Sequence, residues 1–500
     1  MASLTDSTNC GGCGIPCATG QICRGGACQC IFGILCNGAC EPPETTQCKT
    51  TESTLVTSAP GAYWQTDGQL AEVAMGDADV TVHDNATAQT WEGFGGSFNE
   101  MGWHYLSMLG ASDRDAAVRL LYGADGARLA FGRIPIGASD YAMDRYTLDE
   151  TADDTSLASF SIARDMQLLI PFIKAAQAVK ASIRFWASPW TPPTWMKQGP
   201  FSAGNVYSPF DGGTMKDDDV TMRAFAQYFV RFVQAYAQQG IAIEAISPQN
   251  EPSYTGNYPT CGWSPATYAK FVGQHLGPAL AGEGLVTKIV LGTFNDSRSD
   301  PGIVGRVMDD DSARSHIGVL GFQWGMLEKV GGAKSYRLPI WQTEHKCGNY
   351  PWEKDKTFRA DMAPNDHAYA VESWGLIRDW IEAGVTAYSA WNMVLDTVGV
   401  GIDTTRVWPQ NALLTVDTAT KTLNITPTYY VFRHFSQFVA QGAKVVVARG
   451  GDAVAFRNPD GSIVVVVHNA GAARTMTLAT AGRRLQFAMP GNGWATVVAR

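Results

Sequence analysis

The sequence predicts an α/β chain: a (β/α)8 TIM barrel with a flanking β-sandwich domain and a small N-terminal disulfide-rich module. Three observations predict this architecture. Eight short apolar runs alternate with helix-length segments between residues 91 and 411. From residue 412 the chain is strand-like to its end. Nine of the eleven cysteines lie within the first 50 residues.

Residues 1–50 are predicted to form a module stapled by disulfides. Cysteines at this density, set among glycines, are typical of small secreted folds. Zinc binding is the alternative, since Cys10 and Cys13 have the spacing of a metal-ligand pair, but histidine is absent from this segment. The odd number leaves one thiol to pair elsewhere or stay free. The nine residues are Cys10, Cys13, Cys17, Cys23, Cys28, Cys30, Cys36, Cys40 and Cys48.

Composition and charge narrow the possible partners. The formal net charge of −9 repels phosphate, and no long basic run is present, so neither nucleic acid nor a membrane surface is expected as a partner. No apolar run reaches about 18 residues, so no transmembrane segment is predicted. Residues Met1–Asn9 lack the basic and apolar regions of a signal peptide. The cysteine content still predicts a secreted or extracytoplasmic protein, exported by another route or after removal of a leader, and we expect a monomer.

A linker and a divided β-sandwich are predicted around the barrel. Residues 51–60 are interpreted as a linker because the sequence around them is rich in Pro, Thr and Ser. Residues 61–90 contain short alternating segments that read as strands. Because a few strands alone cannot bury a core, residues 61–90 and 412–500 are predicted to form one sandwich. Its C-terminal strands are expected near 443–447, 453–457, 463–468, 475–478 and 494–499.

Residues 91–411 are predicted to be the barrel. Each apolar run is followed by a segment long enough for a helix, and polar residues stand at the ends of the runs. A doubly wound sheet is the alternative, but eight evenly spaced units favour a closed barrel. The strands are expected near 91–96, 128–136, 182–188, 242–249, 288–293, 317–323, 338–343 and 386–391.

Two predicted strands, the fourth and the seventh, lead into a glutamate, Glu251 and Glu344 respectively. Catalysis in such barrels occurs at the carboxyl ends of the strands. Retaining glycosidases need two carboxyl groups about 5–5.5 Å apart, one protonated to donate to the leaving oxygen and one ionised to attack the anomeric carbon. Glu251 is the better acid, since Asn250 beside it can hold the sugar 2-hydroxyl, and Glu344 is the better nucleophile. A barrel-top salt bridge or a helix N-cap is the structural alternative for either glutamate.

Tryptophans near the predicted strand ends provide a second signal. Flat aromatic faces stack on the apolar faces of sugar rings. A single tryptophan at a strand end is more often part of the core, but six near one rim favour a sugar-binding cleft. They are Trp186, Trp190, Trp195, Trp263, Trp324 and Trp391.

Several segments together resemble glycoside hydrolase family 30, with the glucosylceramidase and β-1,6-glucanase branches most similar. The similarity covers roughly residues 55–500 and excludes the Cys-rich module. The motifs occur in the family's order and at predicted strand ends. They are WEGFGGSFNE at 91–100, RIPIGASDY at 133–141, ASPWTPPTWM at 187–196, PQNEP at 248–252, the strand ending at Glu344, and Trp391-Asn392.

The resemblance implies a role for each matching residue. Glu251 would be the acid/base and Glu344 the nucleophile, in agreement with the reasoning from the residues alone. The remaining positions would bind substrate, with Asp140 and Trp190 around the terminal glucose and Asn411 matched more loosely. A buried ion pair is the structural alternative for Arg133 and Asp140. The implied substrate-binding residues are Arg133, Asp140, Trp190, Asn250, Trp324, Trp391 and Asn411.

The sequence departs from the family at the end of the sixth strand. The family often has His-Trp-Tyr there, whereas this chain has Gln323-Trp324-Gly325, so the tyrosine that usually steadies the nucleophile is missing.

The predicted function is retaining hydrolysis of a β-linked glucoside by two glutamates, without cofactor or metal. β-1,6-Glucan is favoured over glucosylceramide, because a Cys-rich exported protein suits an extracellular polymer. Xylosidase, fucosidase and galactanase activities also occur in the family. A non-catalytic glycan-binding protein is an alternative of another class. A metal-dependent hydrolase would need His and Asp ligands at strand ends, and none of the 8 histidines pairs convincingly.

Overall fold

The structure, a computed structural model of the 500-residue chain, describes residues 53–73, 77–201, 204–346, 365–405, 407 and 409–500. It also describes the backbone of four short strands near the N-terminus. The predicted disulfides of the Cys-rich module therefore lie outside the described side chains. The four strands are β1 (Gln21–Arg24), β2 (Ala27–Cys30), β3 (Leu35–Cys36) and β4 (Ala39–Cys40).

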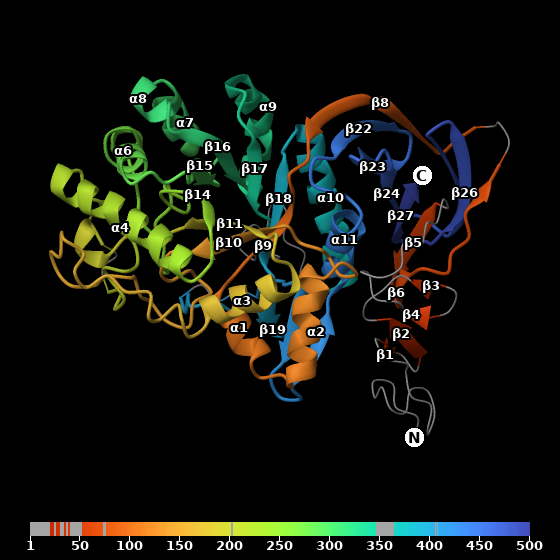
Figure 1. Cartoon of the computed structure of the whole chain (residues 1–500), viewed down its shortest axis with the longest axis horizontal. Helices are drawn as coiled ribbons and strands as arrows, with labels where there is room; N and C mark the ends of the chain where they lie inside the picture. Colours follow the sequence, from red (N-terminus) through yellow and green to blue (C-terminus); the bar gives the residue numbers. More distant parts are fainter. Residues whose placement is uncertain are drawn as a thin grey trace.

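A closed barrel of eight parallel strands occupies the centre of Figure 1, as predicted. Every predicted barrel strand is present, with ends that move by a few residues. In spatial order the barrel runs β10-β11-β14-β15-β16-β17-β18-β9. The strands are β9 (Gly93–Ser97), β10 (Phe131–Pro135), β11 (Arg184–Ser188), β14 (Ile243–Ile246), β15 (Lys288–Phe294), β16 (Ile317–Gln323), β17 (Ile340–Glu344) and β18 (Ala387–Asn392).

Helices follow each barrel strand and cover the outside of the barrel. α4 shows why: an apolar stripe faces the barrel, and the Asp218 side chain accepts a hydrogen bond from the Thr221 N–H to begin the helix. Short helical turns supplement them, including Thr194–Met196, Phe271–Leu276, Trp324–Lys329 and Lys334–Tyr336. The helices are α1 (Glu100–Leu106), α2 (Ala111–Tyr122), α3 (Leu169–Val179), α4 (Asp219–Gln238), α5 (Pro265–Lys270), α6 (Gly277–Gly282), α7 (Asp300–Met308), α8 (Asp311–Arg314), α9 (Val330–Ala333), α10 (His367–Ala383) and α11 (Pro427–Ser436).

The glycine-rich start of the barrel has a packing reason. A Cβ added to Gly95 would meet the backbone and side chain of Phe131 on β10, and one added to Gly96 would meet the Met393 side chain. Side chains larger than hydrogen at these positions would force β9 away from its neighbours. The glycines of the motif at 91–100 are therefore needed for the close packing of β9 against its neighbours.

One layer of apolar side chains fills the barrel interior. Seven strands contribute to it, and it includes Phe131, Trp186, Val319 and Trp341. Because side chains two residues apart on a strand face the same side, Arg133 and Ser188 point into the barrel above this layer. The same alternation directs Gln323 inward from β16. The polar groups of the site thus rest on a packed apolar layer.

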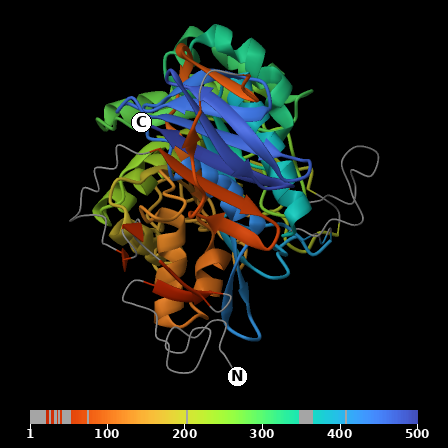
Figure 2. The same cartoon turned by 90° about the vertical axis from the view of Figure 1, so that its right-hand side faces the viewer.

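The second domain is a ten-stranded sheet (Figure 2). Some of its strands precede the barrel in sequence and the others follow it. Its order is β6-β5-β27-β24-β23-β22-β8-β25-β26-β7, so the strand before the barrel, β8, pairs with C-terminal strands. Apolar side chains from the two halves of the sheet form a core of their own. The strands are β5 (Thr54–Ala59), β6 (Ala62–Gln65), β7 (Ala71–Glu72), β8 (Val80–Thr90), β22 (Lys444–Arg449), β23 (Asp452–Arg457), β24 (Ile463–Asn469), β25 (Arg474–Thr480), β26 (Arg483–Met489) and β27 (Gly493–Ala499).

The domain boundaries differ from the prediction at two places. β5 lies within the segment interpreted as a linker, where it pairs with β27. After residue 412, β20 (Leu414–Asp417) and β21 (Thr422–Ile425) join β19 (Val394–Asp396) in a separate small sheet. The following helix α11 packs with barrel side chains in the main core. The ten-stranded sheet therefore takes up the chain again at β22 and not at 412.

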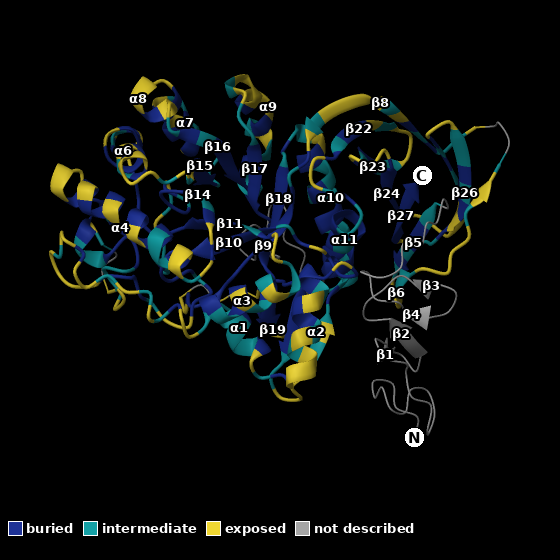
Figure 3. Ribbon diagram, in the orientation of Figure 1, coloured by how far each residue is buried: buried dark blue, intermediate teal, exposed yellow. Residues whose placement is uncertain are grey.

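Barrel and sheet are joined by a partly buried polar contact as well as by apolar packing. Asp452 on β23 accepts hydrogen bonds from Trp374 and Arg378 of α10, at 2.8 and 2.6 Å, and lies 3.0 Å from His468. In Figure 3 the barrel strands and the facing side of the sheet are buried, while the outer faces of the helices are exposed. None of the helices in the described part of the chain is both long and apolar enough to cross a membrane.

Candidate active site

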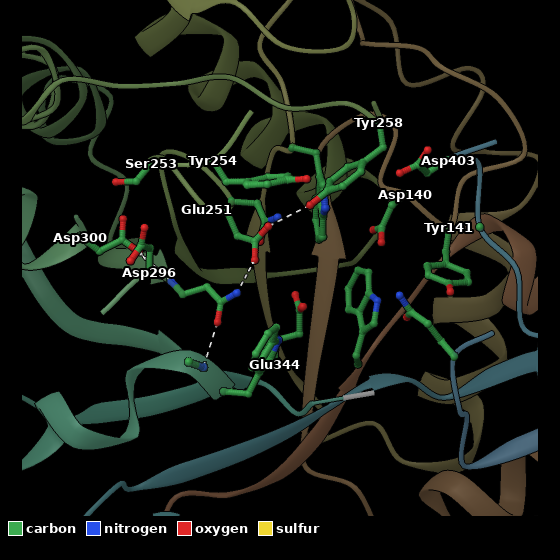
Figure 4. A pocket seen from close by; sticks show the side chains of 18 of the residues that line it. Asp140, Tyr141, Glu251, Ser253, Tyr254, Tyr258, Asp296, Asp300, Glu344 and Asp403 are labelled. Carbon is green, nitrogen blue, oxygen red and sulfur yellow. Dashed lines mark hydrogen bonds between the residues drawn. The ribbon is translucent and has the colours of Figure 1, made fainter. Parts of the chain in front are cut away.

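A cavity of about 500 Å³ opens at the carboxyl ends of the barrel strands. It contains seven of the nine residues predicted for the site: Asp140, Trp190, Asn250, Glu251, Trp324, Glu344 and Trp391. Arg133 and Asn411 do not line it. Figure 4 shows Glu251 and Glu344 pointing into this cavity. The strand-end positions that were far apart in sequence thus meet in one place.

Glu344 is the last residue of β17, and its environment is built to hold a carboxylate. Arg133 donates a hydrogen bond from its Nη1 to Oε2 at 2.7 Å, and Gln323 donates from Nε2 to the same oxygen at 3.2 Å. The residue is 8% exposed. Its carboxyl group is therefore largely shielded from solvent, forms an ion pair and still faces the cavity.

Glu251 follows β14 on a sharply turned loop. Its φ of 46° lies in the left-handed region, which non-glycine residues seldom adopt and which is enriched at functional sites. Its backbone N–H donates to the Thr293 carbonyl at 2.9 Å, which holds this turn. The carboxyl group accepts hydrogen bonds at 2.9 Å from the Tyr258 hydroxyl and from the Asn295 amide. Its hydrogen-bond partners are neutral, and no cation among the described residues forms an ion pair with it, in contrast to Glu344.

Arg133 organises the floor of the site beneath the cavity. Its guanidinium is fully buried and donates to Glu344, to Ser188 Oγ and to Asn250 Oδ1, the last at 2.7 Å. Its Cζ lies 4.4 Å from the centre of the Trp190 ring, close enough for a cation–π contact. The buried ion pair that was the structural alternative for Arg133 is thus formed with Glu344 itself.

Asn250 is fixed by three donors on one oxygen. Its Oδ1 accepts from Arg133, from Thr293 Oγ1 at 2.8 Å and from Gln323 Nε2 at 2.8 Å. This network assigns the amide orientation. Because Asn250 lines the cavity, its Nδ2 group can donate to a ligand hydroxyl.

The two glutamates differ electrostatically. Burial raises the pKa of the Glu251 carboxyl, and the Asp300 carboxylate raises it further. Burial also raises the pKa of Glu344, but the Arg133 guanidinium acts against this and favours its ionised form. Because each carboxylate disfavours ionisation of the other, the pair retains a proton to higher pH than isolated carboxyls do. The 2.7 Å ion pair with Arg133 favours the ionised form of Glu344 relative to that of Glu251.

Aromatic rings and a buried carboxyl form the other end of the cavity. Trp190 and Trp391 stack with ring centres 5.2 Å apart. Burial and the nearby charge of Glu251 raise the pKa of Asp140 to about 7. In place of Asn411, the neighbouring Gln410 lines the cavity and accepts a hydrogen bond from Asn392 at 2.9 Å. The loose match at 411 is therefore displaced by one residue.

Three of the six tryptophans expected at the rim have other roles. Trp186 lies in the apolar layer inside the barrel, and Trp263 packs against Phe225 and Phe271 beneath the helices. Trp195 packs against the main core, and its Nε1 donates to the Asp149 carbonyl. Only Trp190, Trp324 and Trp391 line the cavity. A position at a strand end therefore did not distinguish tryptophans that line the cavity from tryptophans that pack in the core.

Three residues that donate hydrogen bonds to Glu251 or Glu344 were not among the predicted set. Asn295 directly follows β15 and Gln323 ends β16, so reading strand ends for amides as well as carboxyls would have found both. Tyr258 lies seven residues after Glu251 within a loop, where no local pattern marks it. Among the described residues, no cluster of three or more His, Cys, Asp or Glu side chains is arranged to hold a metal ion.

The fold and the cavity define a class of protein: a barrel hydrolase with two opposed carboxyl groups in one pocket, one paired with a cation and one with neutral donors. This chain belongs to glycoside hydrolase family 30 and is a glycoside hydrolase. Residues 91–439 match the family model for the "Glycosyl hydrolase family 30 TIM-barrel domain", and residues 442–497 match that for the "Glycosyl hydrolase family 30 beta sandwich domain". The resemblance inferred from the motifs is confirmed.

The relatives of this chain include proteins named as glucosylceramidases and as endo-1,6-glucanases. The lysosomal acid glucosylceramidase of Mus musculus is 28% identical over 414 residues, covering 78% of this chain and 77% of its own. The endo-1,6-beta-D-glucanase neg1 of Aspergillus fumigatus is 27% identical over 421 residues, covering 78% and 81%. The solved structure of the endo-beta1,6-glucanase BT3312 has a TM-score of 0.76 at 23% identity, covering 89% of this chain and 98% of that one.

Arg133→Lys is expected to lower kcat/KM by about 100-fold, because the single nitrogen of lysine cannot reproduce the planar set of donors that reaches Ser188, Asn250 and Glu344. Steady-state kinetics on an aryl β-glucoside would measure the loss. A thermal melt of the same variant is the control, because it shows whether the loss of activity comes from unfolding. A folded variant with kcat/KM within threefold of wild type would contradict this role.

Proposed function

We propose that this protein is a retaining β-glucosidase that cleaves β-1,6-glucan by double displacement, with Glu344 as nucleophile and Glu251 as acid/base. The observation that carries the proposal is the contrast between the two carboxyl groups in one cavity. Glu344 is paired with Arg133, which favours the anion that a nucleophile requires. Glu251 has neutral partners and a raised pKa, as a general acid at near-neutral pH requires.

In the proposed first step, a Glu344 oxygen attacks the anomeric carbon and the bond to the leaving oxygen breaks. Glu251 gives its proton to that oxygen. In the second step, Glu251 takes a proton from water, which attacks the same carbon and releases Glu344. Asn250 Nδ2 is the donor for the sugar 2-hydroxyl. Neither step uses a metal or an organic cofactor.

Support for a sugar leaving group comes from the side of the cavity beyond Glu251. In Figure 4, Ser253, Asp296 and Asp300 lie on the side of Glu251 away from Asp140. Since Glu251 protonates the leaving oxygen, the leaving group belongs on that side. Ser297 and Arg298, the residues that follow Asp296, also line the cavity. Hydroxyl and charged groups suit the hydroxyls of a second glucose better than the alkyl chains of ceramide. The relatives named as endo-1,6-glucanases favour the same choice.

A substrate panel tests the proposal. β-1,6-Glucan, glucosylceramide in mixed micelles, β-1,4-galactan, and aryl β-xyloside and β-fucoside are compared by kcat/KM, with Glu344→Gln as the inactive control. We expect β-1,6-glucan to be the best substrate, and proton NMR to detect the β-anomer as the first product. A first-formed α-anomer would refute retention. Faster cleavage of glucosylceramide or another panel member would replace the substrate. Glycan binding without turnover by the wild type would favour the lectin-like alternative.

The proposal includes action outside the cytoplasm, supported by the nine cysteines between residues 10 and 48. Fractionation of the native host, followed by thiol labelling of the purified protein, tests this. Recovery in the cytoplasm with those cysteines reduced would contradict it.

A further inference from the structure

The loop that follows β15 contacts Glu251 through Asn295, whose side chain makes two hydrogen bonds. Asn295 Nδ2 donates to Glu251 Oε1 at 2.9 Å. Its Oδ1 accepts the backbone N–H of Gly325 at 2.9 Å. Because the amide is held at both ends, its donor group can only face the glutamate. Dashed lines in Figure 4 mark the hydrogen bonds of the Glu251 carboxyl group.

Gly325 makes this arrangement possible. A Cβ at this position would clash with the carbonyl oxygen of Asn295 and lie 2.5 Å from its Oδ1. Any larger residue at 325 would therefore displace Asn295 from Glu251. The glycine that replaces the family's frequent tyrosine thus has a local consequence: it allows the loops after β15 and β16 to lock against each other.

Asp300 holds the backbone of the same loop. It is the first residue of α7 and is 1% exposed. Its Oδ2 accepts the backbone N–H groups of Asn295, at 2.8 Å, and of Asp296, at 2.7 Å. These bonds set where the Asn295 side chain begins. The Asp300 carboxylate also lines the cavity on the side of Glu251.

We propose that Asn295 and Asp300 together orient Glu251 and set its protonation state, Asn295 through its hydrogen bond and Asp300 through its charge and its hold on the Asn295 backbone. They are positioning residues, because they act through Glu251. This inference rests on the proposed acid/base role of Glu251.

The charges around Glu251 predict opposite effects for the two residues. Burial raises its pKa, the Tyr258 hydroxyl lowers it, Asp300 raises it, and Asn295 and Arg133 lower it. Glu344 from β17 and Asp140 from the loop after β10 also interact electrostatically with Glu251. Asp300 itself is buried, which raises its own pKa, with Ser253 and Asp296 beside it. Removing the Asp300 charge should lower the pKa of Glu251, and removing the Asn295 donor should raise it.

Two variants test these signs. Asp300→Asn keeps an oxygen that can accept both backbone N–H groups, so it removes charge with little change of shape. Asn295→Ala removes the donor to Glu251. The readout is kcat/KM against pH with an aryl β-glucoside that has a poor leaving group. Activity falls at alkaline pH as the acid loses its proton. We expect this fall to begin about 0.5–1 pH unit lower in Asp300→Asn and at higher pH in Asn295→Ala.

Asp309→Asn is the matched control, because it makes the same charge change in an exposed residue at the far end of α7. Its profile should coincide with that of the wild type. Shifts of equal sign in the two test variants, or an unchanged profile in a folded Asp300→Asn, would overturn the inference. If Asp300→Asn does not fold, the Asn295→Ala variant decides. An alkaline fall of kcat/KM at the same pH as in the wild type, or at lower pH, would overturn the inference.

Glu251→Ala separates this inference from the proposed function. If its profile keeps the alkaline limb, Glu251 is not the titrating acid, and both the proposed role and the inference fail. If the limb disappears in Glu251→Ala but stays in place in the two test variants, only the inference fails.

Discussion

Glu344→Ala is expected to lower kcat by about 10⁴-fold or more on every β-glucoside, whatever its leaving group. In the proposed mechanism this glutamate supplies the attacking oxygen, and it forms the 2.7 Å ion pair with Arg133. Removing it leaves the Arg133 guanidinium buried without that partner. Initial rates at saturating substrate, with a melting curve to show that the variant folds, measure the effect.

Azide extends this test to the geometry of the reaction. A small anion can enter the space left by Glu344 and attack the anomeric carbon from the same face, so the rescued product should be an α-glucosyl azide. Glu328→Gln is the control, since this glutamate is 65% exposed at its side chain and lies outside the cavity. Residual activity within tenfold of wild type in Glu344→Ala would remove Glu344 as the nucleophile.

Glu251→Ala is expected to show a loss that depends on the leaving group. For a poor leaving group, such as an alkyl or sugar alcohol, we expect kcat/KM to fall by about 10²–10⁴-fold, because protonation of the oxygen is lost. For 2,4-dinitrophenyl β-glucoside, which leaves without a proton, kcat/KM should change by less than about tenfold. kcat/KM is the quantity to compare, since it reports the first bond cleavage and not the slower hydrolysis of the glucosyl-enzyme.

Azide distinguishes this variant as well. With Glu251 absent and Glu344 in place, the anion attacks the glucosyl-enzyme from the opposite face and should give a β-glucosyl azide. Equal losses for good and poor leaving groups would exclude the acid/base role. Such a result would redirect attention to Asp140, whose pKa burial also raises.

The sequence alone was sufficient to predict the barrel and the two glutamates. Barrel strands are local runs of apolar residues, so their number and order can be read without knowing what they contact. A residue at the carboxyl end of such a run must face the mouth of the barrel. Glu251, Glu344 and Asn250 are placed by this rule, whereas Arg133, in the middle of β10, was assigned from the resemblance to the family.

The contacts between loops could be known only from the tertiary structure. Tyr258 donates a hydrogen bond to Glu251 from within a loop that has no periodic pattern. Only glycine fits at position 325, because the backbone of Asn295 passes beside it. Gln410 lines the cavity in place of Asn411 because the Gln410 N–H bonds to the Gly399 carbonyl at 2.8 Å, which sets the loop register.

The same limit applies to the domain boundary after residue 412. β20 and β22 are both short strands with buried residues, and nothing in either segment states which partner it pairs with. Strand formation depends on neighbouring residues, whereas strand pairing depends on chain segments that are distant in sequence. The sequence by itself therefore determined which elements form and which carboxyl groups reach the barrel mouth. The tertiary structure decided which polar neighbours hold those carboxyl groups, and the proposed roles of acid and nucleophile rest on those neighbours.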